Sequence, residues 1–396
     1  MSRKIAVTGI GMFSAIGNDV HSHLESLMQG KSGISQLENF KTKYAGKIPV
    51  GEIKISSQSL YQQLDLNTPG ITRTTLLALK AFKEAIASAG LSNALISSPD
   101  TAIINANTVG GMCLTDEMYA DSKPGTPASA YLASYSFAAT AVFLQEYYRA
   151  KGIINTINTA CSSSANSIMY AARLMKAGKI NRAIAGGSDS LAKFTVNGFN
   201  ALRILSANPC RPFDVNRSGL NLGEGAAYLA LEWEDDAKGK KIYGYLAGFG
   251  NANDSFHASS LSPEGYGPQL SMQTALEHSG LSSNQIDYIN AHGTATENND
   301  LVESIAMKKI FGKVPSFNST KCLTGHTLGA AGALEACVSL LSLQEQKIFP
   351  ATGFSKPISE TNLVPVTRLT EMRLNHVMSN SFGFGGNCSS LIFSKP

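Results

Sequence analysis

The fold is decided by two stretches, RTTLLALKAFKEAIASAGLSNALISSPDTAIINANTV at residues 73–109 and QLSMQTALEHSGLSSNQIDYINAHGTAT at residues 269–296. Each runs from a helical pattern through a Gly-Leu turn to a β-branched segment, which ends on INAN in the first stretch and on INAH in the second. A chain that repeats one β-α-β-rich unit predicts two related α/β layers. Their strands should be apolar throughout, because both faces of such sheets are buried.

A second pair of segments supports this duplication. Residues 158–179 and residues 322–347 each begin with a turn of small residues and continue as a long helix that is apolar on one face. The two copies meet within EWEDDAKGKKIYGYLAG, residues 232–248, and no low-complexity linker separates them. We therefore predict an N-terminal half, residues 1–240, and a C-terminal half, residues 241–396, that share one packed core.

Composition limits the class of protein. The 396 residues are 43% hydrophobic and 16% charged, with a formal net charge of +4, which fits a compact enzyme or a tight oligomer. No block of Lys and Arg resembles a nucleic-acid-binding arm, so no nucleic-acid partner is expected. The apolar start of the chain is far shorter than the roughly 20 residues of a membrane span. Six cysteines without a C-x-x-C pair or a secretory leader predict a cytoplasmic protein with reduced thiols.

Cys161 is the first candidate for chemistry. It follows the β-branched run IINTINT and precedes the helical pattern SSSANSIMYAARLMKAG, so we expect it at a strand-to-helix turn. The free N–H groups and the positive end of a helix favour a thiolate over a thiol. The alternative is a small buried core residue, which is a common environment for a free cysteine.

Two histidines lie on glycine-bearing turns at matching ends of the repeated units. His292 follows the second β-branched run, and His326 precedes a small-residue helix. One loop histidine is more often an ordinary surface group, but two at matching positions indicate a site. Cys161, His292 and His326 lack the short ligand spacing of structural zinc sites, so no metal is predicted.

Glu335 and Lys321 are the next candidates. Glu335 lies inside the apolar segment LGAAGALEACVSLL, where a carboxylate costs free energy unless it is paired. Lys321, before the same turn, is the predicted partner and would help to hold His326. The alternatives are a carboxylate at the helix edge and a surface lysine.

The last glycine cluster is SNSFGFGGNCSSLIF, residues 379–393. Glycines let backbone N–H groups approach a ligand, and Phe382 or Phe384 between them could plug a cavity. The alternative is a glycine-rich turn without a ligand. Near the N-terminus, TGIGMFSAIG lacks the dinucleotide-binding spacing, so no nucleotide cofactor is predicted.

Taken together, these segments resemble the β-ketoacyl-[acyl-carrier-protein] synthases of the Cys-His-His branch. The motifs that carry the resemblance, in the family's order, are VTGIGMFSAIGNDV, NTACSSSANS, CRPFDVNRSGLNLGEGAA, NAHGTATENND, NSTKCLTGHTLGAAGALEA and SNSFGFGGN. The resemblance implies the thiolase fold, with two related α/β halves in five layers, α-β-α-β-α. It also implies a homodimer as the usual assembly and no organic cofactor or metal.

The resemblance assigns roles by position. Cys161 would accept an acyl group from the phosphopantetheine thioester of acyl carrier protein, and His292 and His326 would stabilise the enolate formed from a malonyl thioester. Lys321 and Glu335 match the family's supporting pair. Phe384 matches its gate, with the backbone N–H groups of Cys161 and Phe384 as the oxyanion hole.

The resemblance also implies residues for the acyl channel and for carrier-protein docking. Val109, Met112 and Phe199 fall in segments that line the acyl channel of similar enzymes. Arg203 and Arg73 are candidates for steering the acidic acyl carrier protein.

Departures from the family pattern leave alternatives open. The family often reads GFGGTN where this chain has Asn387 and Cys388, and the frequent Gly-Pro before the nucleophile is missing. A fatty acid enzyme and a specialised polyene or polyketide enzyme both fit. A chain-length-setting partner subunit of a heterodimeric synthase generally lacks the nucleophile, which this chain keeps. TGH at His326 argues against a thiolase and against a priming synthase.

Overall fold

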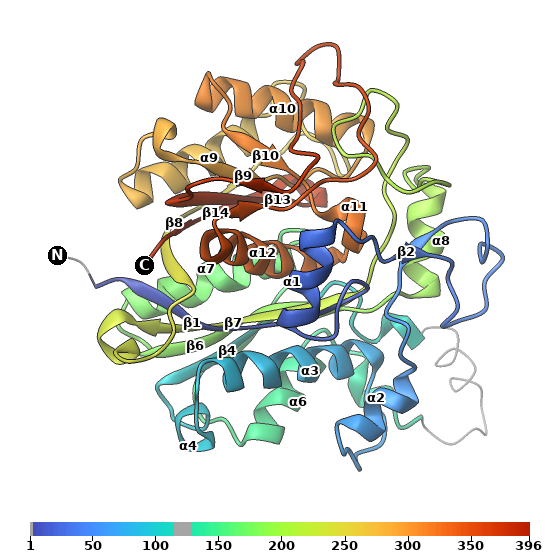
Figure 1. Ribbon diagram of the computed structural model, residues 1–396. Helices are drawn as coiled ribbons and strands as arrows, with labels where there is room; N and C mark the ends of the chain where they lie inside the picture. The colour runs from blue at the N-terminus through green and yellow to red at the C-terminus, as the bar shows by residue number, and fades with distance from the viewer. Residues whose placement is uncertain (1–2, 115–128) are drawn as a thin grey trace.

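The computed structural model describes residues 3–114 and 129–396 (Figure 1). Ten of the described strands form one long sheet, and β2 (Ile34–Ser35) with β3 (Val50–Gly51) and β11 (Lys347–Ile348) with β12 (Thr370–Glu371) form two small ones. The strand order is β10-β9-β13-β14-β8-β1-β7-β6-β4-β5. The strands of the first half are β1 (Ile5–Ser14), β4 (Thr101–Ala106), β5 (Ile154–Ile157), β6 (Arg182–Asp189) and β7 (Gly225–Trp233). The strands of the second half are β8 (Gly244–Asn253), β9 (Tyr288–Asn290), β10 (Ser316–Asn318), β13 (His376–Phe382) and β14 (Asn387–Ser394).

The two halves of the sheet have the same topology. Numbered within its own half, each set of strands has the order 3-2-4-5-1, with parallel pairing at the outer strands and antiparallel pairing at the inner ones. The halves touch where β1 pairs with β8 over Ala6↔Tyr245 and Val7↔Gly244. The chain passes from one half to the other between β7 and β8.

Helices cover the sheet layers on both sides and fill the space between them (Figure 1). Helices α3 (Arg73–Ser88) and α6 (Ala139–Tyr148) form one outer layer, and α9 (Tyr266–Ser279) and α10 (Glu297–Phe311) form the other. Helices α7 (Ser163–Lys176) and α12 (Ala331–Glu345) lie in the middle. The predicted duplicated α/β fold in five layers is therefore confirmed.

Smaller elements complete the chain. They are α1 (Val20–Gln29), β2 (Ile34–Ser35), β3 (Val50–Gly51), α2 (Ser57–Gln63), α4 (Asn93–Ile96), α8 (Lys193–Ala201), α11 (Lys321–Thr324), β11 (Lys347–Ile348) and β12 (Thr370–Glu371). Short 3-10 turns include η2 (Leu132–Ser134) and η3 (Glu234–Ala237). Over the described residues, every helix lacks the combined length and apolar character that crossing a bilayer requires.

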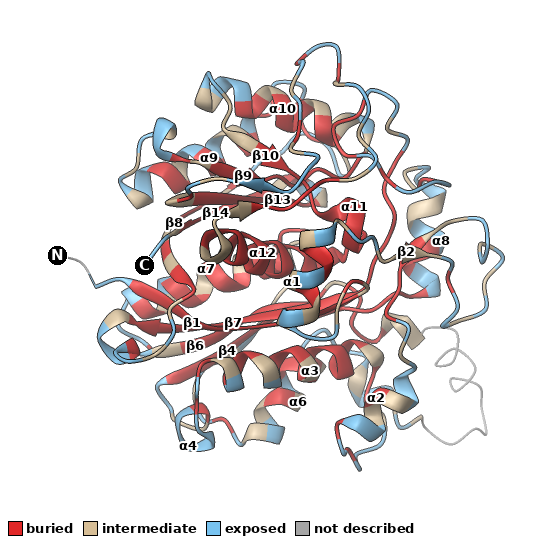
Figure 2. Cartoon of the chain, in the orientation of Figure 1, coloured by how far each residue is buried: buried red, intermediate tan, exposed pale blue. Residues whose placement is uncertain are grey.

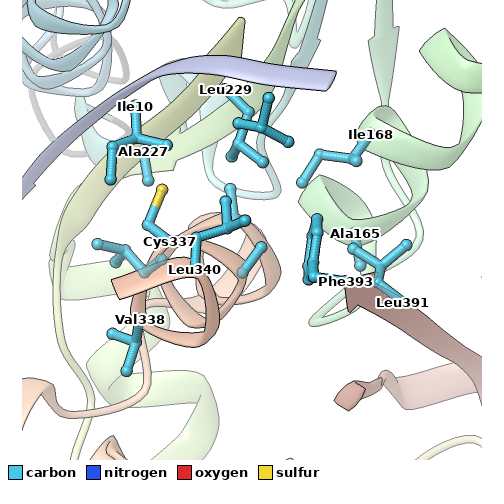
Figure 3. Packing of buried hydrophobic residues seen from close by; sticks show 14 of the residues in the cluster. Ile10, Ala165, Ile168, Ala227, Leu229, Cys337, Val338, Leu340, Leu391 and Phe393 are labelled. Atoms are coloured by element: carbon cyan, nitrogen blue, oxygen red, sulfur yellow. The ribbon is translucent and has the colours of Figure 1, made fainter. Parts of the chain in front are cut away.

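The middle helices pack against both halves of the long sheet and against each other. Figure 3 shows Cys337 and Leu340 of α12 near Ile10 and Leu229 of the first half, with Phe393 of the second half beside them. A Cβ at Gly332 of α12 would lie 2.7 Å from the backbone nitrogen of Ala165 in α7, so only glycine allows this approach.

Burial follows the layers, as Figure 2 shows: the sheet and the middle helices are buried, and exposed residues lie on the outer helices and loops. All ten residues of β1 are buried, as expected for a strand covered on both faces.

Helix α3 begins with a side-chain cap and ends at the turn that the sequence predicts. Thr72 caps α3 by accepting a hydrogen bond from the backbone N–H of Thr75, and the helix ends before Ala89-Gly90-Leu91, where the sequence predicts the turn.

Candidate active site

Cys161 lies on a tight turn between β5 and α7, which we call the nucleophile turn (residues 159–162). Ala160 has a φ of +55°, a left-handed conformation that is uncommon for a residue with a Cβ and that often occurs at functional sites. Ser163, the first residue of α7, holds the turn: its Oγ donates to Ala160 O (2.5 Å) and accepts from the backbone N–H of Thr159 (2.9 Å). The turn directs Cys161 toward a cavity.

The two histidines come from the other half of the molecule. His292 follows β9, and the backbone N–H groups of His292 and Gly293 both donate to the Glu303 carboxylate (2.8 Å each). His326 lies between α11 and α12, where its backbone N–H donates to Asn221 O (2.7 Å). Both imidazoles are about 2% exposed. Two different backbone anchors therefore fix the two rings.

The structure brings Cys161, His292 and His326 together. One ligand atom from each of the three side chains lies within 4.8 Å of the other two, and the imidazole centroids are 5.4 Å apart with the rings nearly perpendicular. All three side chains line one cavity of about 410 Å³. The cavity can therefore admit a small molecule. It is lined by three segments that are distant in sequence: residues 159–162, the loop after β9 and the loop after α11.

Both imidazoles have a defined tautomer. The backbone N–H of Leu328 donates to His326 Nδ1 (3.2 Å), and the Lys321 ammonium donates to His292 Nδ1 (3.3 Å). Burial lowers the pKa of both histidines well below the usual value, so the rings are neutral near pH 7. With Nδ1 accepting, the ring proton is on Nε2, and each imidazole offers one N–H donor.

This tautomer bears on the possibility of a metal. Histidines that bind metals usually donate through the second ring nitrogen to an acceptor, which leaves a lone pair on the ligating nitrogen. Here Nδ1 accepts in both rings, and Nε2 holds the proton. The three side chains are close enough to be considered as ligands, but their hydrogen bonds favour proton donation over metal ligation.

Comparisons with known proteins agree with this geometry. The family model described as "Beta-ketoacyl synthase, N-terminal domain" matches residues 2–237, and the model described as "Beta-ketoacyl synthase, C-terminal domain" matches residues 243–355. The chain belongs to the β-ketoacyl synthase family.

Similar members of the family include 3-oxoacyl-[acyl-carrier-protein] synthase 2 of Coxiella burnetii, 32% identical with 99% of each chain covered. The enzyme of the same name in Staphylococcus aureus (strain COL) is 31% identical, with 100% of this chain and 99% of that protein covered. Among solved structures, the ishigamide ketosynthase/chain length factor is 26% identical with a TM-score of 0.93 over 100% of both chains. A ketosynthase in complex with its chain length factor from Xenorhabdus doucetiae is 29% identical, with a TM-score of 0.85 over 100% of this chain and 98% of that one.

The supporting pair of this β-ketoacyl synthase family member is buried, and its two members contact each other. The Lys321 ammonium donates to Glu335 Oε1, to His292 Nδ1 and to His292 O (2.5 Å), so all three of its N–H bonds are used. Burial raises the pKa of Glu335 to about 7, and the nearby Lys321 opposes that rise. The predicted pairing is present. However, Lys321 contacts His292, whereas the sequence suggested His326.

The pKa of Cys161 corrects one expectation. The helix start was expected to favour the thiolate, but burial raises the pKa of Cys161 to about 11. Lys321 and the backbone N–H groups of Phe384 and Cys161 oppose this rise only in part. Desolvation of the charged form is larger than the stabilisation by the N–H groups, so the resting group is a thiol.

This assignment predicts how Cys161 reacts with iodoacetamide. Only the thiolate is alkylated, so the rate at Cys161 should rise about tenfold per pH unit between about pH 7 and pH 9 and should not level off there. The neutral histidines do not titrate in this range. Peptide mapping after timed quenching measures the rate. A plateau below about pH 8 would show instead that the resting group is a thiolate.

Phe384 lines the same cavity as the histidines. It lies in a loop that we call the gate loop (residues 383–386), and its ring stacks on Phe199 with centroids 5.8 Å apart. A Cβ at Gly383 would lie 2.6 Å from Thr159 O and 3.1 Å from Cys161 N, so the gate loop contacts the nucleophile turn directly. Phe382 is buried and contacts the His292 ring.

Of the residues predicted for the acyl channel and for carrier-protein docking, only some line the cavity. Phe199 and the exposed Arg203 line the cavity, as an acyl-channel residue and a docking residue would require. Val109 is fully buried in an apolar cluster against which Met112 and Phe199 pack, but neither Val109 nor Met112 lines the cavity. Their proposed contact with an acyl chain therefore lacks support from the cavity described.

The prediction for Arg73 is wrong on geometric grounds. Its guanidinium is bound by the buried Glu224 carboxylate through two hydrogen bonds (2.8 and 2.6 Å) and by the backbone oxygens of Ile53 and Ile55. The side chain is only 11% exposed, so its charge is already neutralised within the protein. Arg73 is therefore part of a buried ion pair and does not present a docking surface.

Several residues that shape the site were not predicted from the sequence. Glu303 fixes the His292 turn, Asn221 anchors His326, and Thr294 and Thr296 line the cavity. A buried carboxylate in α10 was a signal that could have indicated Glu303, since such groups need several donors. The other contacts depend on segments that only folding brings together.

Proposed function

We propose that this chain is a 3-oxoacyl-[acyl-carrier-protein] synthase that performs a decarboxylative Claisen condensation in fatty acid or polyketide synthesis. One observation carries the proposal: Cys161 and two neutral imidazoles with fixed Nε2–H tautomers face one cavity. The curated relatives named above bear that activity in their names.

In the first step, Cys161 Sγ attacks the carbonyl carbon of an acyl thioester on the carrier protein. The C–S bond to phosphopantetheine breaks, and the thiol proton of Cys161 ends on the departing pantetheine sulfur. The negative charge that develops on the carbonyl oxygen is met by the backbone N–H groups of Cys161 and Phe384. Because the thiolate is the nucleophile, the proton must leave Sγ as the new C–S bond forms, and the exchange as a whole consumes no base.

In the second step, a malonyl thioester occupies the same cavity. Its carboxylate leaves as carbon dioxide, and the electron pair moves into an enolate whose oxygen accepts from His292 Nε2–H and His326 Nε2–H. The enolate carbon attacks the acyl group on Cys161, the Sγ–C bond breaks, and Cys161 takes up one proton. The product is a 3-oxoacyl thioester on the carrier protein.

The proposed chemistry uses no organic cofactor and no metal. Phosphopantetheine arrives on the carrier protein as part of the substrate. Cys161, Cys210, Cys322, Cys337 and Cys388 form no disulfide, which fits the reducing cytoplasm where we place the reaction.

The direct test supplies purified chain with an acyl-carrier protein and a malonyl-carrier protein, and follows the products by mass spectrometry. We expect a 3-oxoacyl-carrier protein two carbons longer than the acyl substrate, together with release of carbon dioxide. Absence of extension across a graded series of acyl lengths and degrees of unsaturation would reject the proposal. The series also reports the preferred chain.

A second candidate function is that of a subunit in a heterodimeric synthase, because two of the similar structures are described with a chain length factor. Exposed apolar side chains in the segment before β5 favour an assembly: Leu132, Tyr135, Phe137, Val142, Tyr147 and Ile153. Helix α6 of this segment contacts β5, which is the last strand in the order of the described sheet. We propose these side chains, together with β5, as the subunit interface.

Sedimentation of the chain alone tests the assembly. It should give a dimer if the chain pairs with itself, and a monomer that lacks extension activity if the chain needs a different partner.

Carrier-protein docking gives a further prediction. Arg203 is exposed at the cavity, so Arg203→Glu should raise KM for an acidic carrier protein about tenfold at low salt and leave kcat nearly unchanged. The difference should shrink as salt is added. Lys238→Glu is the matched control, because Lys238 is also exposed but follows η3, outside the residues that line the cavity. If both charge reversals raised KM equally, the net charge of the protein, and not the position of Arg203, would explain the change in KM.

A further inference from the structure

Asn387 joins the gate loop to the nucleophile turn by its side chain. Its Oδ1 lies within hydrogen-bonding distance of three donors: Ser162 Oγ (2.7 Å), Asn166 Nδ2 (2.7 Å) and Asn251 Nδ2 (3.0 Å). Ser162 directly follows Cys161, and Asn166 lies one turn later in α7. Asn387 itself is the first residue of β14, directly after the gate loop.

The backbone of Asn387 closes the gate loop at the same point. Its carbonyl accepts from the N–H of Gly383 (2.7 Å), and the Gly386 N–H donates to Gly383 O (3.1 Å). On its other side the gate loop bonds to residues 254–258, through Gly385 N–H to Ala258 O and Asp254 N–H to Gly386 O (2.8 Å each). Asn387 is therefore the residue whose side chain ties this small loop to α7.

We propose that Asn387 is a positioning residue that sets the separation between the backbone N–H groups of Phe384 and Cys161, and so the geometry of the oxyanion hole. The inference rests on the proposed function, since it assigns those two N–H groups to the oxygen of the acyl thioester. The connection is short: Cys161 is one residue from Ser162, and Phe384 is three residues from Asn387. Displacing one N–H by a fraction of an ångström weakens its bond to the developing oxyanion.

The partners of Asn387 have other bonds, so its loss should not unfold the protein. Ser162 Oγ also lies 2.8 Å from Thr159 O, and Asn166 Nδ2 lies 2.8 Å from Thr159 Oγ1. These donors remain satisfied in Asn387→Ala, which limits the cost in stability. The expected effect is a displaced gate loop within an intact fold.

The test separates acyl transfer, which uses the oxyanion hole, from decarboxylation, which uses the histidines. Asn387→Ala should slow acylation of Cys161 by a small S-acyl-N-acetylcysteamine thioester about tenfold, somewhat less than the loss of a whole oxyanion donor. Decarboxylation of malonyl-carrier protein, measured with Cys161→Gln as background, should change less than about twofold on adding Asn387→Ala. Asn253→Ala is the matched control, because Asn253 is the cross-strand neighbour of Asn387 and its amide donates to Ser255 Oγ instead.

A double-mutant cycle tests the route through Ser162. If Asn387 acts on the nucleophile turn, Ser162→Ala should slow acylation in the same way, and the double variant should be no slower than the slower single variant. Unchanged acylation in Asn387→Ala, equal losses in acylation and decarboxylation, or additive effects of the two substitutions would each overturn the inference. The small thioester does not involve a carrier protein, so failure of the proposed function would appear separately, as acylation by the small thioester without extension on carrier proteins.

Discussion

Cys161→Ala is expected to abolish chain extension, with a loss of about 10⁴-fold or more. Cys161 is the one thiol among the described residues that line the cavity, and removing a nucleophile from a site that works as a unit eliminates most of the rate. The fold should survive, because a small side chain at a tight turn is replaced by a smaller one. Extension of acyl-carrier protein followed by mass spectrometry measures the loss, and thermal unfolding checks the fold.

Cys161→Gln separates decarboxylation from chain extension. It removes the nucleophile but leaves His292, His326 and their tautomers in place, so malonyl-carrier protein should still lose carbon dioxide. Decarboxylation without extension would show that the two steps use different groups. If Cys161→Ala extended chains at the wild-type rate, the whole assignment of the site would be wrong.

Lys321→Met should lower decarboxylation about 100-fold, although Lys321 does not touch the substrate in our account. Without the ammonium, His292 Nδ1 loses its donor, and the ring can place its proton on the wrong nitrogen. Losses of this size are typical when an acid or base group is misoriented. Decarboxylation in the Cys161→Gln background is the measurement, because acylation does not contribute there.

The same change should also destabilise the protein, by about 3 to 5 kcal/mol, since it leaves the buried Glu335 without its partner. Burial already raises the pKa of Glu335 to about 7, and removing Lys321 raises that pKa further. The loss of stability should be about 1 kcal/mol larger at pH 8 than at pH 5, because the folded Glu335 carboxyl is protonated below about pH 7 with or without Lys321 and only ionises above it in the wild-type chain. Denaturant unfolding at both pH values measures it.

The double variant Lys321→Met with Glu335→Gln separates the two effects. It removes the unpaired charge and should recover most of the stability, but His292 still lacks its donor and decarboxylation should stay low. Recovery of decarboxylation together with stability would mean that Lys321 only supports the fold.

Much of the fold could be predicted because local signals and the duplication agree. The Gly-Leu turns after α3 and α9, and the buried strands β4 and β9 that follow, were all visible in residues 73–109 and 269–296. The residues of the candidate site could also be predicted from the sequence. They lie on glycine-bearing turns at the ends of strands and helices, where segments of the two halves meet.

Other features could not be predicted because they depend on burial and on distant partners. Arg73 has the sequence context of a surface cation, yet Glu224, 151 residues further along the chain, binds it. The helix start argued for a Cys161 thiolate, and only the degree of burial reverses that direction. Asn387 was noticed as a departure in sequence, but its contact with Ser162 joins residues 225 positions apart.

The most direct test of the central claim is the intact mass of the protein after brief incubation with an acyl-carrier protein, followed by peptide mapping. We expect a single acyl group on Cys161 in the wild-type chain and none in Cys161→Ala. An acyl group on a different residue, or a wild-type chain that stays unmodified by every acyl-carrier protein and by the small thioester, would contradict it.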